Sequence, residues 1–511
     1  MKKILNKKSF LVILGFLGYF LLSFLYIWSI FKLIVCKKYY GTLSMPYLVM
    51  NIIFILIILF LIFYKINNRP LEKTYMFIVI PVGLAFMILQ PMHHKPDEPH
   101  HIYRTYDIVV NHNLMPDKDE KNISRIEYPI KAAQLHGNAV NNLKLVDDNI
   151  NKYVDFDKTV NVASTAAGYS PLAYVFSSIG MFFGLLFHLS WYKVLLFSRF
   201  GNFIFTIIIG FLIIKKVPYA KLVFFVYLLN PMLLHQATAV SGDSVLNMLS
   251  LYYIVYLLYN KHNKNSLSYK DIALSMVLLL IISLIKLPYI LLSLLLLIFY
   301  KKDLLKNDKR KIILTIFCLV IIVFILLLHR KMFTYINEPQ YVNDSVDLKS
   351  QLLFILKNPL NYLLILFNDI LNKSEFYLTS FAGKYLAWVD LENHSLATIV
   401  YLIILSISPF IYVTEDDEKN NTFFLKKTIF IGSFIVLYLC LLTGMYLEWT
   451  SVKSTSIVGF QGRYLIPILI LIPLAFQNNR KNLKYSYKVP YTICLLIVNF
   501  LMLYNLVIAY I

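Results

Sequence analysis

Apolar runs long enough to cross a lipid bilayer recur along this chain of 511 residues. At a rise of about 1.5 Å per residue, a helix of roughly 20 apolar residues spans a hydrocarbon core of about 30 Å. Only 15% of the residues are charged, whereas 59% are hydrophobic. Because a helix satisfies its own backbone hydrogen bonds, helices are the elements that such runs form in lipid. We therefore expect an all-α polytopic membrane protein rather than a soluble enzyme.

The spacing of the apolar runs predicts about 13 transmembrane helices. We expect them near residues 10–35, 47–64, 74–91, 194–214, 219–239, 244–260, 271–285, 287–300, 311–329, 396–413, 428–447, 464–476 and 489–510. They divide the chain into N-terminal membrane helices (1–91), a first extracytoplasmic loop (92–193), further membrane helices (194–329), a second extracytoplasmic region (330–395) and C-terminal membrane helices (396–511).

The distribution of basic residues predicts which face of the membrane each loop occupies. Of the 49 Lys and Arg residues, 26 lie in seven short basic segments beside apolar runs. Such loops are typical of the cytoplasmic side. The net charge of +21 is thus a topology signal, and we expect no nucleic-acid partner. The protein is expected to be a multi-pass protein of the cell membrane.

The apolar run 171–188 allows two topologies. If it spans the membrane, the later basic loops fall outside and the charge asymmetry is inverted. If it lies along the outer face, all the later basic loops fall inside. The second reading fits the opening Ser170-Pro171 and the glycines Gly180 and Gly184. We therefore expect a juxtamembrane helix in a large first outer loop.

The segment Pro96-Asp97-Glu98-Pro99 follows directly on the third apolar run. Proline favours the first turn of a helix, so a helix is expected from about Pro99 to Val110. Asp97 and Glu98 would lie at its positive N-terminal end, with His101 and Arg104 along one side. One interpretation is a carboxylate that accepts a proton, oriented by these neighbours. The alternative is an N-cap with a salt bridge to Arg104. The position at a membrane face favours the catalytic interpretation.

Four other charged residues interrupt apolar segments or lie at their ends: Arg199, Asp243, Lys286 and Arg463. Ionisable groups in membrane segments are energetically costly and often functional. For the three basic residues the alternative is snorkelling to the interface or an interhelical ion pair. Asp243, in Ser241-Gly242-Asp243-Ser244, is a candidate second carboxylate or a helix N-cap.

The histidines near the acidic segment raise the question of a metal ion. Carboxylate and imidazole groups suit several divalent ions, and Asp97 and His101 are the candidate ligands. The spacing matches no specific zinc template, so a divalent metal is a candidate cofactor and none is certain.

The ordered set of motifs resembles a family of bacterial membrane proteins, domain of unknown function 2142. Pro96-Asp97-Glu98-Pro99 is followed by Ser170-Pro171-Leu172, Ser241-Gly242-Asp243-Ser244, Lys286-Leu287-Pro288-Tyr289, Gly383 to Asp390 with Trp388, and Gly462-Arg463-Tyr464. The resemblance covers roughly residues 75 to 510. The chain departs from the family pattern in His93-His94-Lys95 and in an additional N-terminal helical hairpin.

The resemblance implies a GT-C-like fold and an enzyme of the GT-C glycosyltransferase type. Such an enzyme uses a polyprenyl-phosphate sugar donor and a glycan or lipid-linked acceptor on the extracytoplasmic face, among membrane lipids. Asp97 would be the general base of an inverting displacement, with Glu98 and His101 orienting it or the acceptor. The leaving phosphate would be bound by candidates from the set Arg104, Lys286, Arg463 and Arg199.

Three other functions stay open on the sequence, of which a non-catalytic assembly partner is disfavoured by the acidic motif. A polysaccharide polymerase or ligase would use the same kind of substrate, and its chemistry overlaps with glycosyl transfer. A transporter or flippase of lipid-linked glycans would place paired ionisable groups near the middle of the bilayer. In this chain the acids cluster near a membrane surface, which favours an enzyme.

Overall fold

The computed structural model describes residues 7–40, 48–49, 51–59, 70–114, 123–126, 160–163, 166, 168–264, 266–299, 309–333, 345–387, 389, 391–393, 395–411, 423–477 and 488–510. Helices dominate this part of the chain, which confirms the all-α expectation. Two small antiparallel pairs accompany them: β1 (Ile123–Ile126) with β2 (Val160–Ala163), and β3 (Tyr385–Leu386) with β4 (Leu391–Glu392). Trp388 and Asp390 of the sequence motif lie outside the described residues.

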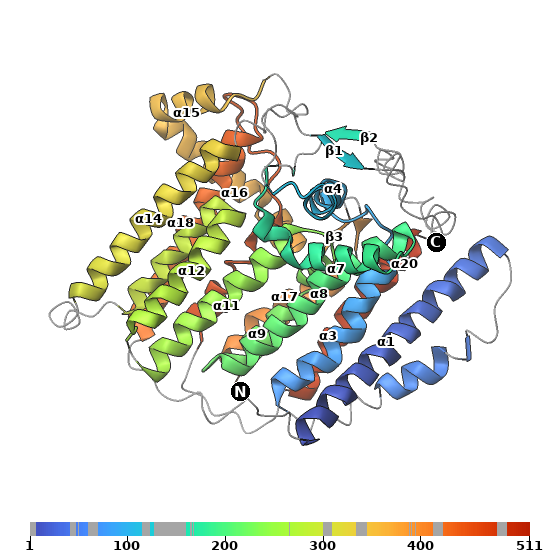
Figure 1. Ribbon diagram of the computed structural model, residues 1–511. Helices are drawn as coiled ribbons and strands as arrows, with labels where there is room; N and C mark the ends of the chain where they lie inside the picture. Colours follow the sequence, from blue (N-terminus) through green and yellow to red (C-terminus); the bar gives the residue numbers. More distant parts are fainter. Residues whose placement is uncertain are drawn as a thin grey trace.

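The long helices lie side by side, and α4 (Glu98–Val109) sits across one end of them together with the β1–β2 pair (Figure 1). The long helices are α1 (Lys7–Tyr40), α3 (Leu71–Ile88), α8 (Trp191–Lys216), α11 (Gly242–Asn263), α12 (Tyr269–Ile285), α14 (Lys309–Phe333), α18 (Phe423–Glu448) and α20 (Lys488–Tyr510). The helix α4 begins one residue before the position that Pro99 predicts.

Six of the described helices are long and apolar enough to cross a membrane, not thirteen. The number rises to seven if α15 (Leu348–Lys357) and α16 (Pro359–Phe381), which meet at 106°, count as one bent span. The chain is therefore a multi-pass membrane protein with fewer uninterrupted spans than its hydropathy predicts.

The lower number arises because several apolar runs are broken into short helices. The run 219–239 divides into α9 (Lys221–Leu228) and α10 (Pro231–Ala237), since Pro231 starts a new helix and the Asn230 side chain accepts from the N–H of Leu233. The run 287–300 is a 3-10 helix, η3 (Leu287–Phe299). The run 464–476 becomes η5 (Gly462–Leu465) and the five-residue α19 (Leu471–Ala475). Proline and cap residues divide a run without making it less apolar, so hydropathy alone overcounts spans.

The run 171–188 forms η2 (Pro171–Tyr174) and α7 (Val175–Leu186), which is too short to count among the six spans. Glycines let α7 pack closely against α8. A Cβ at Gly180 would overlap the carbonyl oxygen of Phe197, and one at Gly201 would overlap that of Phe176. This contact fixes the position of η2, which brings Tyr174 beside α4.

The start of α11 and the end of α12 lie together at the end of the bundle that α4 covers. Ser241 caps α11 by accepting from the N–H of Asp243, and a capping box of Ser268 and Asp271 starts α12. The α11–α12 connection and the helix ends beside it carry Lys261, Lys264 and Lys270. The length of α11, roughly 30 Å, separates them from Asp243. The bundle therefore has one strongly basic end and, at the other end, α4.

Candidate functional site

Two carboxylates and two cations from four separate elements meet at the α4 end of the bundle. Nη2 of Arg463 lies 2.6 Å from Oδ2 of Asp97. Nζ of Lys286 lies 2.8 Å from Oδ1 of Asp243, and Nη1 of Arg463 lies 3.9 Å from Oδ2 of the same residue. Four of the candidates from the sequence thus form one cluster, although they are far apart in the chain.

Asp97 is the residue immediately before α4 and has a left-handed backbone (φ 57°, ψ 8°), which short polar residues tolerate better than others. Its side chain makes no capping hydrogen bond. Instead the carboxylate turns to Arg463, and 44% of the side chain is exposed. The capping alternative therefore does not describe Asp97, and its carboxylate remains accessible from outside the protein.

Asp243 and Lys286 form the second pair because of where their helices begin and end. Ser241 takes the capping position of α11, so Asp243 is not the cap and its side chain is available to Lys286. Lys286 is the residue at which α12 ends. Its Nζ also lies 4.4 Å from the centre of the Tyr464 ring, a cation–π contact.

Arg463 reaches both carboxylates because Gly462 allows its segment to approach α16. A Cβ at Gly462 would overlap the backbone nitrogen of Phe381 and the carbonyl oxygen of Tyr377. The N–H of Gly462 donates to the Ser380 hydroxyl at 2.9 Å. The guanidinium is nearly buried, yet its Nε and Nη1 have no hydrogen-bond partner within the described part of the chain. Buried donors without a partner are costly, and a bound anion would supply one.

The electrostatics of the site keep Asp97 ionised and His101 neutral at pH 7. Burial raises the pKa of Asp97, but the Arg463 guanidinium and His101 outweigh it, and the net pKa lies below the usual value. Burial lowers the pKa of His101 to about 4, although Asp97 and Asp243 act in the opposite direction. His101 is thus an uncharged hydrogen-bonding group beside the carboxylates.

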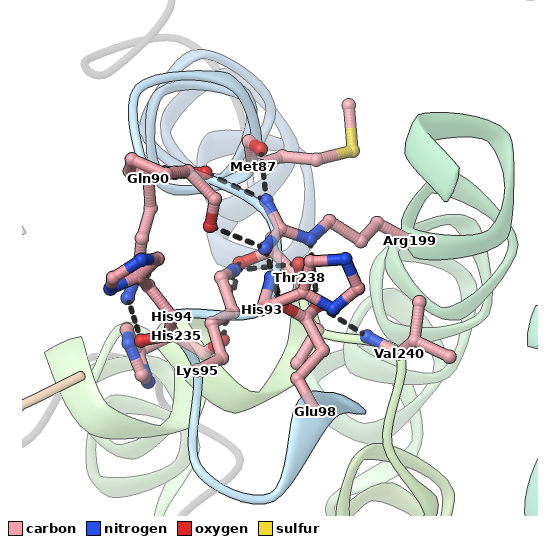
Figure 2. A network of polar contacts seen from close by, with 12 residues as sticks. Met87, Gln90, His93, His94, Lys95, Glu98, Arg199, His235, Thr238 and Val240 are labelled. Atoms are coloured by element: carbon pink, nitrogen blue, oxygen red, sulfur yellow. Dashed lines mark hydrogen bonds and ion pairs between the residues drawn. The ribbon is translucent and has the colours of Figure 1, made fainter. Parts of the chain in front are cut away.

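Glu98 and Arg199 form a separate, fully buried ion pair (Figure 2). Nε and Nη2 of Arg199 contact the two carboxylate oxygens of Glu98 at 2.7 and 2.5 Å. The remaining donors of Arg199 bond three backbone carbonyls, of Met87, Gln90 and Pro91. Glu98 also accepts from the N–H groups of His93 and Val240. The pair therefore joins the α3–α4 turn to α8 and to the segment before α11.

This arrangement changes the assignments made from the sequence. Every N–H of Arg199 has a protein partner, so the geometry favours a structural role over phosphate binding. Both carboxylate oxygens of Glu98 likewise accept hydrogen bonds from the protein. Glu98 is therefore suited to holding Asp97 in place rather than to contacting an acceptor. Burial raises the pKa of Glu98, but Arg199 and its neighbours outweigh this and bring it to about 2.

Lys95 adds a second anchor on the same turn. Its fully buried Nζ donates to the carbonyl and hydroxyl oxygens of Thr238, both at 2.6 Å, and to the carbonyl of His235 at 3.2 Å (Figure 2). The position of Asp97, two residues later, is therefore fixed on both sides by buried charged groups.

Arg104 points away from the carboxylate cluster. It pairs with Asp107 at 3.3 Å and donates to the carbonyls of Tyr169, Asn113 and Leu114. The side chain is fully buried, so it ties two ends of the large loop to α4 rather than facing a phosphate.

The two candidate metal ligands, Asp97 and His101, each contact another side chain of the protein. Nδ1 of His101 lies 2.6 Å from the Tyr174 hydroxyl, and Asp97 is paired with Arg463. Among the described residues, no group of three or more His, Cys, Asp and Glu side chains is arranged to hold a metal ion.

Several aromatic residues of the site were not among the candidates from the sequence. Tyr174 bonds His101, Tyr169 stacks on His101, and the Tyr464 hydroxyl lies 3.2 Å from Nη2 of Arg463. Tyr464 follows Arg463 in a motif that the sequence analysis quoted, which was a usable signal. Nothing in the local sequence distinguishes Tyr169 and Tyr174 from the other 36 tyrosines.

Comparison with known families gives one match. The family model described as "Predicted membrane protein (DUF2142)" matches residues 80–472, which include the whole carboxylate and cation cluster. No curated protein and no solved structure matches the chain.

Proposed function

This chain belongs to the DUF2142 family of membrane proteins, and we propose that it is a GT-C-type glycosyltransferase that moves a sugar from a polyprenyl-phosphate donor to a cell-surface glycan or lipid-linked acceptor. The observation that carries the proposal is the pairing of Asp97 with Arg463. An accessible carboxylate and a guanidinium with two unused donors lie in contact. These are the two groups that an acid–base step with an anionic leaving group requires.

In the proposed reaction the acceptor hydroxyl oxygen attacks the anomeric carbon of the donor sugar. The bond from that carbon to the phosphate oxygen breaks, and its electron pair leaves with the polyprenyl phosphate. The proton of the acceptor hydroxyl passes to Asp97, and the configuration at the anomeric carbon is inverted. The low pKa of Asp97 suits a proton transfer that follows bond formation, when the acceptor oxygen has become strongly acidic.

The charge balance of the cluster couples proton transfer to Asp97 with the departure of the polyprenyl phosphate. Asp97 and Asp243 balance Lys286 and Arg463, so the four groups together carry no net charge. Protonation of Asp97 leaves one positive charge without a partner. The leaving phosphate gains one negative charge in the same step, and Arg463 is placed to bind it.

The location of the cluster supports an enzyme rather than a flippase. Transporters place paired ionisable groups near the middle of the bilayer, often on broken helices. Asp243 and Lys286 instead occupy the beginning of α11 and the end of α12. The lysines at the opposite end of these helices favour a cytoplasmic position for that end, and therefore an extracytoplasmic position for the site.

The proposal is tested by reconstituting the full chain in liposomes with short-chain polyprenyl-phosphate glucose, mannose and galactose. Extracted cell-envelope glycans and lipids serve as acceptors, and release of polyprenyl phosphate is measured. The Asp97→Asn variant is expected to lose about two to four orders of magnitude in rate because it has no proton acceptor. The chemical nature of the product separates a simple transferase from a polymerase or ligase.

A matched variant is Glu72→Gln, since Glu72 lies in the first turn of α3, at the end of the helix remote from α4. It removes a carboxylate without touching the cluster and is expected to retain full activity. Equal release by wild type and Asp97→Asn would rule out Asp97 as the base.

A further inference from the structure

The ring of Tyr169 lies at the outer end of a row of three neighbouring aromatic rings close to Asp97. The His101 ring lies between the other two, with its centre 5.7 Å from that of Tyr174 and 5.9 Å from that of Tyr169. Tyr174 is fully buried and His101 nearly so, whereas 39% of Tyr169 is exposed. The rings of Tyr169 and His101 are inclined by only 24°, so one face of Tyr169 covers the imidazole and the rest reaches the surface.

The backbone of Tyr169 is held firmly for a residue with an exposed side chain. Its carbonyl accepts from Nε of the buried Arg104 at 3.2 Å, and its N–H donates to the carbonyl of Ala166 at 3.0 Å. The carboxylate cluster is close enough to Tyr169 to affect the pKa of its hydroxyl group. Burial raises the pKa of Tyr169 above its usual range, and Tyr464 and Asp97 add to the shift. Tyr169 as a whole is 39% exposed, so packing in the core does not by itself account for this anchoring.

We propose that Tyr169 is the platform on which a pyranose ring of the substrate stacks. The face of an aromatic ring is electron-rich and attracts the weakly positive C–H groups that line one face of a pyranose. The hydroxyl groups around the sugar rim would find Asp97 and Arg463 as polar partners. The inference rests on the proposed function and deepens it, because it names the subsite that holds a sugar next to the base. The ring can belong to the donor or to the acceptor.

Binding can be measured without turnover by saturation-transfer difference NMR on the full chain in detergent. The probes are methyl glycosides of glucose, galactose and mannose. We expect saturation transfer to the C–H protons of one face of at least one glycoside in the wild type. The Tyr169→Phe variant keeps the ring and should keep the signal, whereas Tyr169→Leu should lose it. Equal signals in wild type and Tyr169→Leu, or no signal from any glycoside with the wild type, would rule out Tyr169 as a stacking platform for sugars.

Tyr259→Leu is the matched control, because Tyr259 is 40% exposed and lies near the far end of α11. It should bind the glycosides as the wild type does. The Asp97→Asn variant should also give the signal, because stacking needs no base and the asparagine amide can still hydrogen-bond a sugar hydroxyl. If Asp97→Asn loses sugar transfer but keeps the NMR binding signal, the role of Asp97 as base is separated from the role of Tyr169 as platform.

In the transfer assay, Tyr169→Leu should raise KM about three- to tenfold for the substrate whose ring it holds, with little change in kcat. The substrate affected identifies the ring as that of the donor or of the acceptor. An unchanged KM for both, with active wild type, would contradict the platform while leaving the proposed function intact.

Discussion

Arg463 contacts Asp97 across 366 positions of the chain, with Nη2 of the guanidinium 2.6 Å from Oδ2 of the carboxylate. The contact joins the turn before α4 to the segment that begins η5. It also makes one guanidinium the neighbour of both carboxylates, since Nη1 approaches Asp243.

The Arg463→Lys variant should keep the positive charge but lose the planar set of donors. The three N–H groups of an ammonium diverge from a single nitrogen, so they cannot contact Asp97 and also form the parallel, bidentate contact with a phosphate that a guanidinium makes. We expect kcat to fall about 10²-fold, as on removal of a group that stabilises developing charge. Initial rates of polyprenyl phosphate release measure the effect. Arg310→Lys, at the exposed start of α14, should change nothing, and activity near the wild-type level in Arg463→Lys would argue against a phosphate role.

Substitution of Gly462 should impair the site through its neighbour. The Cβ of Gly462→Ala would overlap backbone atoms of Phe381 and Tyr377, so the segment must move and carry Arg463 with it. A displacement of about 1 Å can reduce a rate about 10²-fold. Gly444→Ala is the control, because a Cβ there meets nothing within 4 Å and alanine favours the interior of helix α18. Similar rates for both variants would contradict this role of Gly462.

The Glu98→Gln variant should mainly lose stability. It leaves the Arg199 guanidinium buried without a counter-charge, and breaking a buried pair in this way costs about 3–5 kcal/mol in the free energy of unfolding. Denaturation of the purified protein in detergent measures the loss. Glu392→Gln removes the acid of the exposed pair with Lys384 and should have little effect. If Glu98→Gln and Glu392→Gln have the same free energy of unfolding, the Glu98–Arg199 pair does not anchor the turn between α3 and α4.

The stability of the protein should decrease as the pH falls from about 6.5 to about 4, in part through His101. Burial lowers the pKa of this imidazole from 6.5 to about 4, so in that window the unfolded chain binds a proton that the folded protein does not. Stability then rises with pH, is complete above pH 6.5, and is lost progressively below it. Each such group contributes a slope of at most about 1.4 kcal/mol per pH unit.

His101→Gln removes this contribution and should flatten the dependence of the unfolding temperature on pH between 4 and 6.5. His262→Gln, at the exposed C-terminal end of α11, should leave the wild-type slope. A slope in His101→Gln as steep as in the wild type would show that His101 does not titrate as its burial implies.

Much of the site could be predicted from residue type and local position. A charged residue in or beside an apolar run is costly unless it has a partner or a function, so Asp97, Asp243, Lys286 and Arg463 were identifiable one by one. The role of each charged residue could not be predicted in this way. Arg199 and Arg104 look like Arg463 in the sequence, and only their bonding separates them. Arg199 and Arg104 are surrounded by carbonyls and a carboxylate, whereas Nε and Nη1 of Arg463 have no hydrogen-bond partner among the described residues.

The sequence by itself determined that this chain is a helical, multi-pass membrane protein with an acidic helix start after its third apolar run. Those properties depend on hydropathy and on neighbouring residues, which are local. Only the tertiary structure decided the number of uninterrupted spans, the meeting of four distant charged groups, and the row of three aromatic rings that ends at Tyr169. Those properties depend on where proline and cap residues interrupt helices and on how glycines let segments approach. Composition does not encode such distances between segments.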